Sequence, residues 1–380
     1  MVHRFDILHP SELDEADARA WRAFQTATPV FSNPLLSPQF AQAVGLVRED
    51  ARIAICRSGA GSAQGFLAYH KRPSAFARPI GAPLSDLQAL VSAPQAAVDA
   101  SALFGAAGVR AFKINGLIDP YGLLTRGYET QGASRRIVLN DQASDFLDQM
   151  RARTPNGAKN FKRYSRRLAH DVGELRLVAP DRRSASLAQL LAWKSAQLRQ
   201  TGLHDFLAVQ WIQNLLQRLF ATSQDGFGGL FMALYAGERL VAGQFGVRLG
   251  AHFHPWIAAM DPDLKAYSPG SLFQWMAIEA MPRLGLNIYE LGAQGDHWKN
   301  MFALDALPIR AGTITGAAGR LTTAGERMYE QPAQKMESLA RLRRRLDHIA
   351  ASELTLTGRT RGVIDALIGL ERRNAARNPG

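Results

Sequence analysis

HFHPWIAAMDPDLKAYSPGSLFQWMAIEAM, from His252 to Met281, is the stretch that decides the fold. It opens as an apolar strand, crosses a polar turn, reaches Ser268-Pro269-Gly270 and enters an amphipathic run that predicts a helix. The start of a helix carries unpaired backbone N–H groups and partial positive charge, so this position suits an anion. Gly270 allows close backbone approach, Pro269 fixes the turn, and Ser268 could cap the helix or donate its hydroxyl to a phosphate. The alternative is that these three residues only begin a helix.

Two similar layouts of strands and helices lie on either side of the middle of the chain. In the second half, residues 229–260 predict a three-stranded meander with turns at AGER and RLGA, followed by a helix over 271–285 and a strand over 287–293. In the first half, residues 52–72 predict a hairpin, residues 79–90 are irregular, and a short helix (100–108) precedes a strand (109–117).

The segments between and after these halves are helical and basic. Residues 151–183 contain ten Lys or Arg and three acidic residues, and KNFKRYSRRLAHD predicts a basic helix. Two amphipathic helices are predicted over 186–202 and 208–223. The predicted division is therefore an N-terminal lobe over 1–150, a basic connector over 151–183, a C-terminal lobe over 184–315 and a basic helical tail over 316–380.

Composition narrows the class of protein. A chain of 380 residues is long enough for two domains, and its formal charge of +12 favours anionic partners. No uninterrupted run of 18 apolar residues predicts a membrane span, and the first residues lack the apolar core of a signal peptide. The single cysteine, Cys56, falls in a predicted strand and excludes a disulfide framework. We expect a cytoplasmic protein without a metal site.

The order strand, glycine-bearing loop, helix and strand resembles the core of the GNAT acyltransferases, although their usual glycine-rich signature is missing. Five stretches are together similar to the CelD/BcsL-type GNAT-like family, over roughly residues 20–315. They are WIAAMDPDLKAYSPGSLFQWMAIEA, GLNIYELGAQGDHWKNMFALD, LLAWKSAQLRQTGLHDF, KNFKRYSRRLAHDVGELRL and FSNPLLSPQFAQAV. That family is associated with bacterial exopolysaccharide synthesis, is related to the Fem-type transferases, and includes a holdfast-type setting. The resemblance implies an α/β (α+β) fold with two tandem GNAT-like lobes, each a mixed, mostly antiparallel sheet flanked by helices, with a helical C-terminal appendage. It also implies acetyl-CoA as co-substrate.

Three residues are candidates for acid–base chemistry. Glu290 lies at a predicted strand end, where burial could fit it as a general base, or it is a capped or salt-bridged carboxylate. The family's strand end is Asp-Leu-Gly, and Glu290-Leu291-Gly292 departs from it. His254 shares a strand face with His252 and is a second base candidate, packing being its alternative. The resemblance marks Asp86 near an inter-lobe cleft, whereas its local sequence fits a helix N-cap.

Four further residues are binding candidates. Lys299 could reach a phosphate or a sugar carboxylate, or it is a solvated loop lysine. The resemblance implies that Lys194 is a substrate-binding residue, whereas the sequence alone would place it on the surface. Trp256 and Tyr267 could stack on sugar rings, while Trp275 is expected in the core.

The basic tail has several possible roles. A solvated face is the simplest interpretation of Arg341, Arg343, Arg344 and Arg345. Alternatives are peripheral binding to the anionic inner membrane and a nucleotide such as cyclic di-GMP, whose phosphates and bases arginine can bind.

These observations predict an N- or O-acyltransferase, acting with acetyl-CoA on a sugar of an exopolysaccharide or its precursor. One rival is a catalytically degenerate scaffold gated by cyclic di-GMP. Another is a Fem-type aminoacyl-tRNA-dependent transferase, but the helical arm typical of tRNA contacts is missing, so nucleic acid is not the expected partner.

Overall fold

The structure is a computed structural model that describes residues 2–124, 127–139, 143–224, 226–293, 302–303, 305–315 and 337–364. The chain divides into two compact units, each assembled from separate parts of the sequence. Unit 1 comprises residues 1–134, 202–215 and 307–380, and unit 2 comprises residues 135–201 and 216–306. The predicted boundaries at residues 150, 183 and 315 stay a prediction.

Unit 1 is a mixed sheet with helices. Its strands follow the order β1-β2-β3-β4-β6-β14, with β5 beside β3, and only β4 and β6 pair in parallel. The strands are β1 (Val2–Leu8), β2 (Ala51–Ser58), β3 (Ala63–Arg72), β4 (Phe76–Pro79), β5 (Val91–Ser92), β6 (Ala111–Leu117) and β14 (Asp305–Thr315). The helices are α1 (Glu15–Ala27), α2 (Pro38–Gly45), α3 (Ala100–Ala106) and α11 (Glu337–Ser352), and residues 356–364 are also helical.

Apolar packing explains how this unit holds its helices. The Trp21 ring of α1 stacks on Phe66 of β3 with 4.9 Å between centroids, and Phe104 of α3 meets Phe112 of β6 edge-on at 6.2 Å. The hairpin predicted over residues 52–72 is confirmed as β2 and β3. Cys56 lies buried in β2, and burial raises the pKa of its thiol to about 12, so it is no nucleophile.

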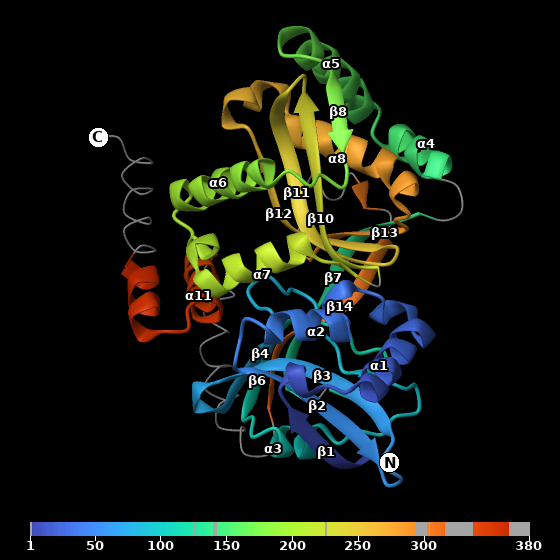
Figure 1. The fold of residues 1–380 in the computed structure, drawn as a ribbon, viewed down its shortest axis with the longest axis vertical. Coiled ribbons are helices and arrows are strands. Elements are labelled where there is room, and N and C mark those ends of the chain that lie inside the picture. The colour runs from blue at the N-terminus through green and yellow to red at the C-terminus, as the bar shows by residue number, and fades with distance from the viewer. Residues whose placement is uncertain are drawn as a thin grey trace. The chain divides into compact units, whose positions relative to one another are not determined.

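Unit 2 contains the mixed run of strands in the order β7-β13-β12-β11-β10-β8 (Figure 1). Only β12 and β13 pair in parallel. The strands are β7 (Gly127–Val138, which enters the unit at Arg135), β8 (Leu175–Val178), β9 (Ser223–Gln224), β10 (Phe227–Ala236), β11 (Arg239–Leu249), β12 (His252–Met260) and β13 (Ile288–Gly292). The helices are α4 (Ala143–Arg153), α5 (Pro155–Asp171), α6 (Ser184–Gln200), α7 (Gln210–Ala221, which crosses from unit 1 at Leu216) and α8 (Pro269–Ala280).

The predicted meander is confirmed as β10, β11 and β12, and its two turns are tight. Ala236 pairs with Arg239 and Leu249 with His252, so two residues close each turn. Gly237 (φ +58°) and Gly250 (φ +54°) take the left-handed backbone that such turns require. These glycines therefore fix which residues of the three strands face each other.

Two helix layers cover the sheet of unit 2. Alternate residues of β10, namely Leu230, Met232 and Leu234, belong to the core that includes Trp275 and Ile278 of α8. Figure 1 shows α6 on the other face, where the Tyr235 hydroxyl donates a hydrogen bond of 2.7 Å to Ser186. The predicted fold class, a mixed open sheet flanked by helices, is confirmed.

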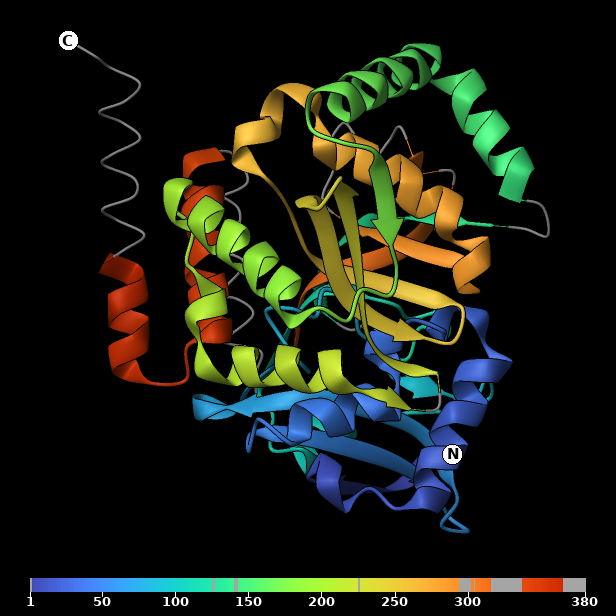
Figure 2. The same ribbon diagram turned by 45° about the horizontal axis from the view of Figure 1, so that its top comes forward.

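The basic helix predicted between the halves is α5, and it lies along α8 (Figures 1 and 2). Its Phe161 ring packs 5.5 Å from Trp275, which is buried as expected. The cations Lys159, Lys162, Arg163, Arg166 and Arg167 remain exposed. Among the described helices none is long and apolar enough to cross a membrane.

Candidate active site

Strands β12 and β13 separate soon after they meet. They pair only at His252 with Ile288 and at Phe253 with Tyr289, although β12 runs on to Met260. Parallel strands that part in this way leave backbone N–H and C=O groups along the facing edge of β12 available to a ligand. Within the described residues, an open strand edge therefore lies beside the candidate residues.

A β-bulge bends β12 at the same place. Phe245 of β11 pairs with Ile257, but Gly246 pairs with Pro255, so Trp256 is the extra residue of the bulge. A Cβ on Gly246 would stand 2.1 Å from the carbonyl oxygen of His254, so the bulge requires glycine opposite it. Trp256 itself is half-buried.

The loop after β12 leads directly into α8. A 3-10 helix (Pro262–Tyr267) is followed by Ser268, whose left-handed backbone (φ +50°, ψ +51°) turns the chain into Pro269. The Ser268 side chain makes no capping hydrogen bond, so of its two candidate roles the helix cap does not form and the phosphate contact stays a prediction. The carbonyl of Ser268 instead accepts from the amides of Ser271 (3.0 Å) and Leu272 (3.2 Å).

Gly270 is the open position of this helix start. It is exposed, and a Cβ there would meet only the Met260 sulfur, at 3.7 Å. Pro269 has no N–H, and the amides of Ser271 and Leu272 both donate to Ser268, so Gly270 supplies the first-turn amide that faces no helical acceptor. The loop thus offers few backbone donors to a phosphate.

Tyr267 ties this loop to α5. Its hydroxyl donates a hydrogen bond of 2.8 Å to the Asp171 carboxylate, and the Arg167 guanidinium lies 5.0 Å from the centroid of its ring. Hydrogen bonds from His170 and Tyr267 hold the pKa of Asp171 below its usual value. An exposed cation of α5 therefore stands beside the residue that precedes Ser268.

Glu290 and His252 form a buried pair on the α6 side of the sheet. Phe253 and Tyr289 belong to the core under α8, so His252, His254 and Glu290 point to the opposite face. Glu290 is 1% exposed, and its Oε1 lies 3.1 Å from His252 Nε2. Burial lowers the pKa of His252, which is therefore neutral and presents an oriented imidazole.

Sequence reasoning named His254 and missed His252 as a partner. Both are buried on the same strand face, as the two-residue period predicts. The distance from His252 to Glu290 depends on how β12 and β13 pair, which no local pattern encodes.

The α8 side of the strand split holds a second polar group. The Tyr289 hydroxyl donates to the side-chain oxygen of Gln244, and the Gln274 amide lies beside it. All three residues are buried, and burial raises the pKa of Tyr289. Polar side chains thus lie under α8 close to the parting strands.

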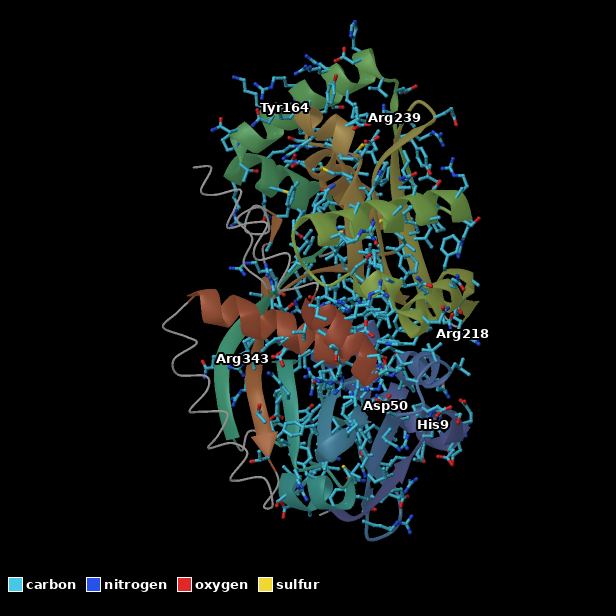
Figure 3. All side chains as sticks on the ribbon, turned by 90° about the vertical axis from the view of Figure 1, so that its left-hand side faces the viewer. His9, Asp50, Tyr164, Arg218, Arg239 and Arg343 are labelled. Atoms are coloured by element: carbon cyan, nitrogen blue, oxygen red, sulfur yellow. The ribbon has the colours of Figure 1, made fainter. Side chains whose placement is uncertain are left out.

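The remaining candidates are scattered. Lys194 is half-buried on α6, donates to Gln197 Oε1 at 3.1 Å, and has its pKa lowered by burial. Its neighbour Trp193 lines an open pocket of about 380 Å³ together with Gln189, Arg239 (labelled in Figure 3) and Asp261. Lys299 lies outside the described residues.

Asp86 belongs to unit 1, and the predicted N-cap there is wrong because no helix begins at Ser85 or Asp86. The Ser85 hydroxyl donates to the Leu87 carbonyl instead, at 3.1 Å. Of the tail arginines, Arg345 is buried and Arg343 is half-buried, so α11 is not a fully solvated helix; the side chains of Arg341 and Arg344 lie outside the described set. In the described part of the chain no cluster of His, Cys, Asp or Glu is placed to hold a metal ion.

Residues 155–300 match the acetyltransferase (GNAT) domain family. No curated protein sequence matches the chain. Among solved structures, FemX is similar with a TM-score of 0.53 at 12% identity, covering 83% of this chain and 98% of FemX. The tandem GNAT protein from the clavulanic acid biosynthesis pathway gives a TM-score of 0.47 at 13% identity, covering 81% and 98%. L-PGS from Bacillus licheniformis gives 0.42 at 11% identity, covering 82% and 95%.

The residues that match the family model include the separated strands β12 and β13. They also include the bulge of β12, the loop and α8, and the pair His252–Glu290. Residues 155–300 are thus similar to a GNAT-type acetyltransferase domain. At 12% identity the likeness to FemX extends to the fold alone.

Proposed function

We propose that the chain is an acyl-CoA-dependent acyltransferase that moves an acetyl group to an amine or hydroxyl of a sugar in a bacterial exopolysaccharide or its precursor, in a holdfast-type system for example. The single observation that carries the acyl-CoA part is the parting of β12 and β13 beside a bulge and before a helix start. The sugar acceptor rests on the sequence resemblance.

The residues present fit acetyl-CoA. An extended pantetheine arm carries two amides, and the open edge of β12 beyond Phe253 offers backbone partners for them. Gly270 leaves room for phosphate at the start of α8, where the helix dipole favours negative charge. A glycine-rich loop would bind the phosphates through its backbone N–H groups, but Pro269 has none. The guanidinium of Arg167 on α5 would bind them instead.

Glu290 is the proposed general base. The acceptor nitrogen or oxygen bonds to the thioester carbonyl carbon, its proton passes to Glu290, and the C–S bond breaks to release the CoA thiolate. His252 holds the carboxylate in place through its Nε2. His254, on the same face, is the alternative base.

The test separates binding from chemistry. Acetyl-CoA binding to the full chain is measured by calorimetry, and thiol release is followed with partly deacetylated chitin oligosaccharides as amine acceptors. Glu290→Gln should bind acetyl-CoA as the wild type does but lose roughly 100-fold or more in kcat/KM, because the proton acceptor is gone. Full activity in this variant would remove Glu290 from the mechanism, and absence of acetyl-CoA binding in the wild type would remove the proposal.

A second candidate is a Fem-type aminoacyl-tRNA-dependent transferase, which the exposed cations of α5 favour. Lys159, Lys162, Arg163 and Arg166 line a helix with no acidic residue before Asp171. Aminoacyl-tRNA binding that weakens steeply with salt, together with no acetyl-CoA binding, would select this function.

A further inference from the structure

Two arginine side chains of unit 1 converge on one oxygen atom. Arg72, at the end of β3, donates from Nη2 to the carbonyl of Glu353 at 3.2 Å. Arg359, in the helical residues 356–364, donates from Nε to the same carbonyl at 3.1 Å. Because both guanidinium groups reach one acceptor, two positive charges lie within a few ångströms of each other.

Arg78 of β4 adds a third charge to this group. Its Nη2 lies 3.5 Å from an Asp347 oxygen on α11. Burial lowers the pKa of the Arg359 guanidinium, and repulsion from Arg72 and Arg78 lowers it further. These three side chains are called the arginine triad below.

The carboxylates around the arginine triad are already shared with other cations. Asp50 (labelled in Figure 3) accepts from Arg48 at 2.8 Å, from His70 at 3.0 Å and from Arg72 at 3.0 Å. Asp347 also forms an ion pair with Lys113, and the Glu353 carboxylate lies 3.1 Å from His204. In the described part of the chain no carboxylate lies within ion-pair distance of Arg359. Four Lys or Arg side chains therefore share two carboxylates, Asp50 and Asp347, and Arg359 is added beside them, a costly arrangement for partly buried charge.

Buried donors in the same place lack acceptors. Arg72 Nε and Arg48 Nη1 are inaccessible to solvent and have no hydrogen-bond partner in the described structure. Unsatisfied guanidinium N–H groups cost stability, so such a cluster calls for an anionic acceptor. Arg78 and Arg359 are only partly buried and can be reached from solvent.

Other contacts hold the C-terminal helices, so the arginine triad is not needed as a latch. Trp211 Nε1 donates to the Ser352 carbonyl at 2.9 Å, Lys113 pairs with Asp347, and Ile349 and Ala351 are buried. A single arginine would suffice for the Glu353 carbonyl.

We propose that Arg72, Arg78 and Arg359 form a binding site for a phosphate-bearing anion, in unit 1 and independent of the acyl-transfer site of unit 2. Guanidinium forks match phosphate oxygens in pairs, and three of them suit a phosphate dianion or a diphosphate better than a halide. From the basic tail the arginine triad takes Arg359, and the predicted anion-binding role of Arg341, Arg343, Arg344 and Arg345 stays a separate prediction.

The test uses inorganic pyrophosphate on the full chain, with ionic strength held constant by potassium chloride. Melting temperature is followed against pyrophosphate concentration, and calorimetry gives the affinity. Wild type should show a saturable rise in Tm. Arg359→Ala should bind at least about tenfold more weakly, because it loses a charge-assisted contact. Arg359→Lys, which keeps the charge but not the fork, should also lose most of the rise.

Two matched controls locate the effect. Arg361→Ala changes an exposed arginine two residues away and should respond to pyrophosphate as wild type does. Lys159→Ala, at an exposed cation of unit 2, should do so as well, which separates the effect from a general loss of positive charge. An equal rise in all variants, or no rise in wild type, would overturn the proposal.

Vesicles identify the source of the phosphate. Sedimentation with phosphatidylglycerol in phosphatidylcholine vesicles that depends on Arg359 and is reversed by pyrophosphate would assign the site to a lipid headgroup. Pyrophosphate binding without such sedimentation would assign it to a soluble phosphate compound.

Discussion

At the scale of single residues, two glycines of unit 2 have different roles. Gly246 faces the bulge in β12, where an added Cβ would stand 2.1 Å from the His254 oxygen and 2.5 Å from the Pro255 Cα. Gly270 faces open space at the start of α8. The first glycine is required by packing of backbone on backbone, and the second leaves room for a ligand.

Alanine substitutions should separate these roles. Gly246→Ala should lower the free energy of unfolding by more than about 2 kcal/mol, since the β11–β12 ladder must shift. Gly270→Ala should leave stability unchanged or slightly raised, because alanine is the better helix former, but should weaken acetyl-CoA binding. Denaturant unfolding and calorimetry measure the two effects. Stability equal to wild type in Gly246→Ala would contradict the bulge geometry.

The sequence predicted individual site residues unevenly. Glu290 was selected from its place at a strand end, and it is indeed buried and paired. Ser268 was a candidate for a helix cap or a phosphate donor. Its left-handed backbone is not the extended conformation of a capping residue, and no capping bond forms. A side chain's role depends on backbone angles that residue type does not fix.

At the scale of elements, α5 brings charge to the loop before α8. The sequence predicted α5 as a basic helix. Its position beside α8 follows from apolar contacts such as Phe161 with Trp275. Arg167 consequently stands at Tyr267.

Arg167→Ala should raise the Kd for acetyl-CoA about fivefold, corresponding to about 1 kcal/mol for one partly exposed charge contact. The effect should shrink at high salt because the contact is screened. Lys159→Ala, an exposed cation two turns earlier on α5, is the matched control and should change the Kd little. Equal losses in both variants would mean that net charge, and not position, governs binding.

At the scale of the whole molecule, buried histidines make stability depend on pH. His70 and His348 lie in unit 1, and burial lowers the pKa of each to about 4. Nearby cations add to this effect: Arg48 for His70, and Arg78 for His348, which also faces His204. Both side chains must be neutral in the folded state.

Stability should therefore fall as pH drops from about 6.5 toward 4, because the unfolded chain binds protons that the folded chain excludes. Each histidine would contribute on the order of 3 kcal/mol to this loss. Denaturant unfolding at several pH values should show a shallower decline in His348→Gln than in wild type. His170→Gln, at an exposed position, serves as control and should follow the wild-type curve. A parallel decline in His348→Gln would show that His348 does not carry the effect.

The sequence by itself determined the fold class, the meander over residues 229–260 and the strand, loop and helix at residues 252–281, because hydrophobic period, glycine turns and helix starts are local signals. Only the tertiary structure decided which side chains meet. His252 reaches Glu290 across paired strands, and Arg72 and Arg359 reach the same carbonyl although they are 287 residues apart. Such contacts depend on strand register and on the packing of helices from distant parts of the chain, and no local pattern of residues predicts them.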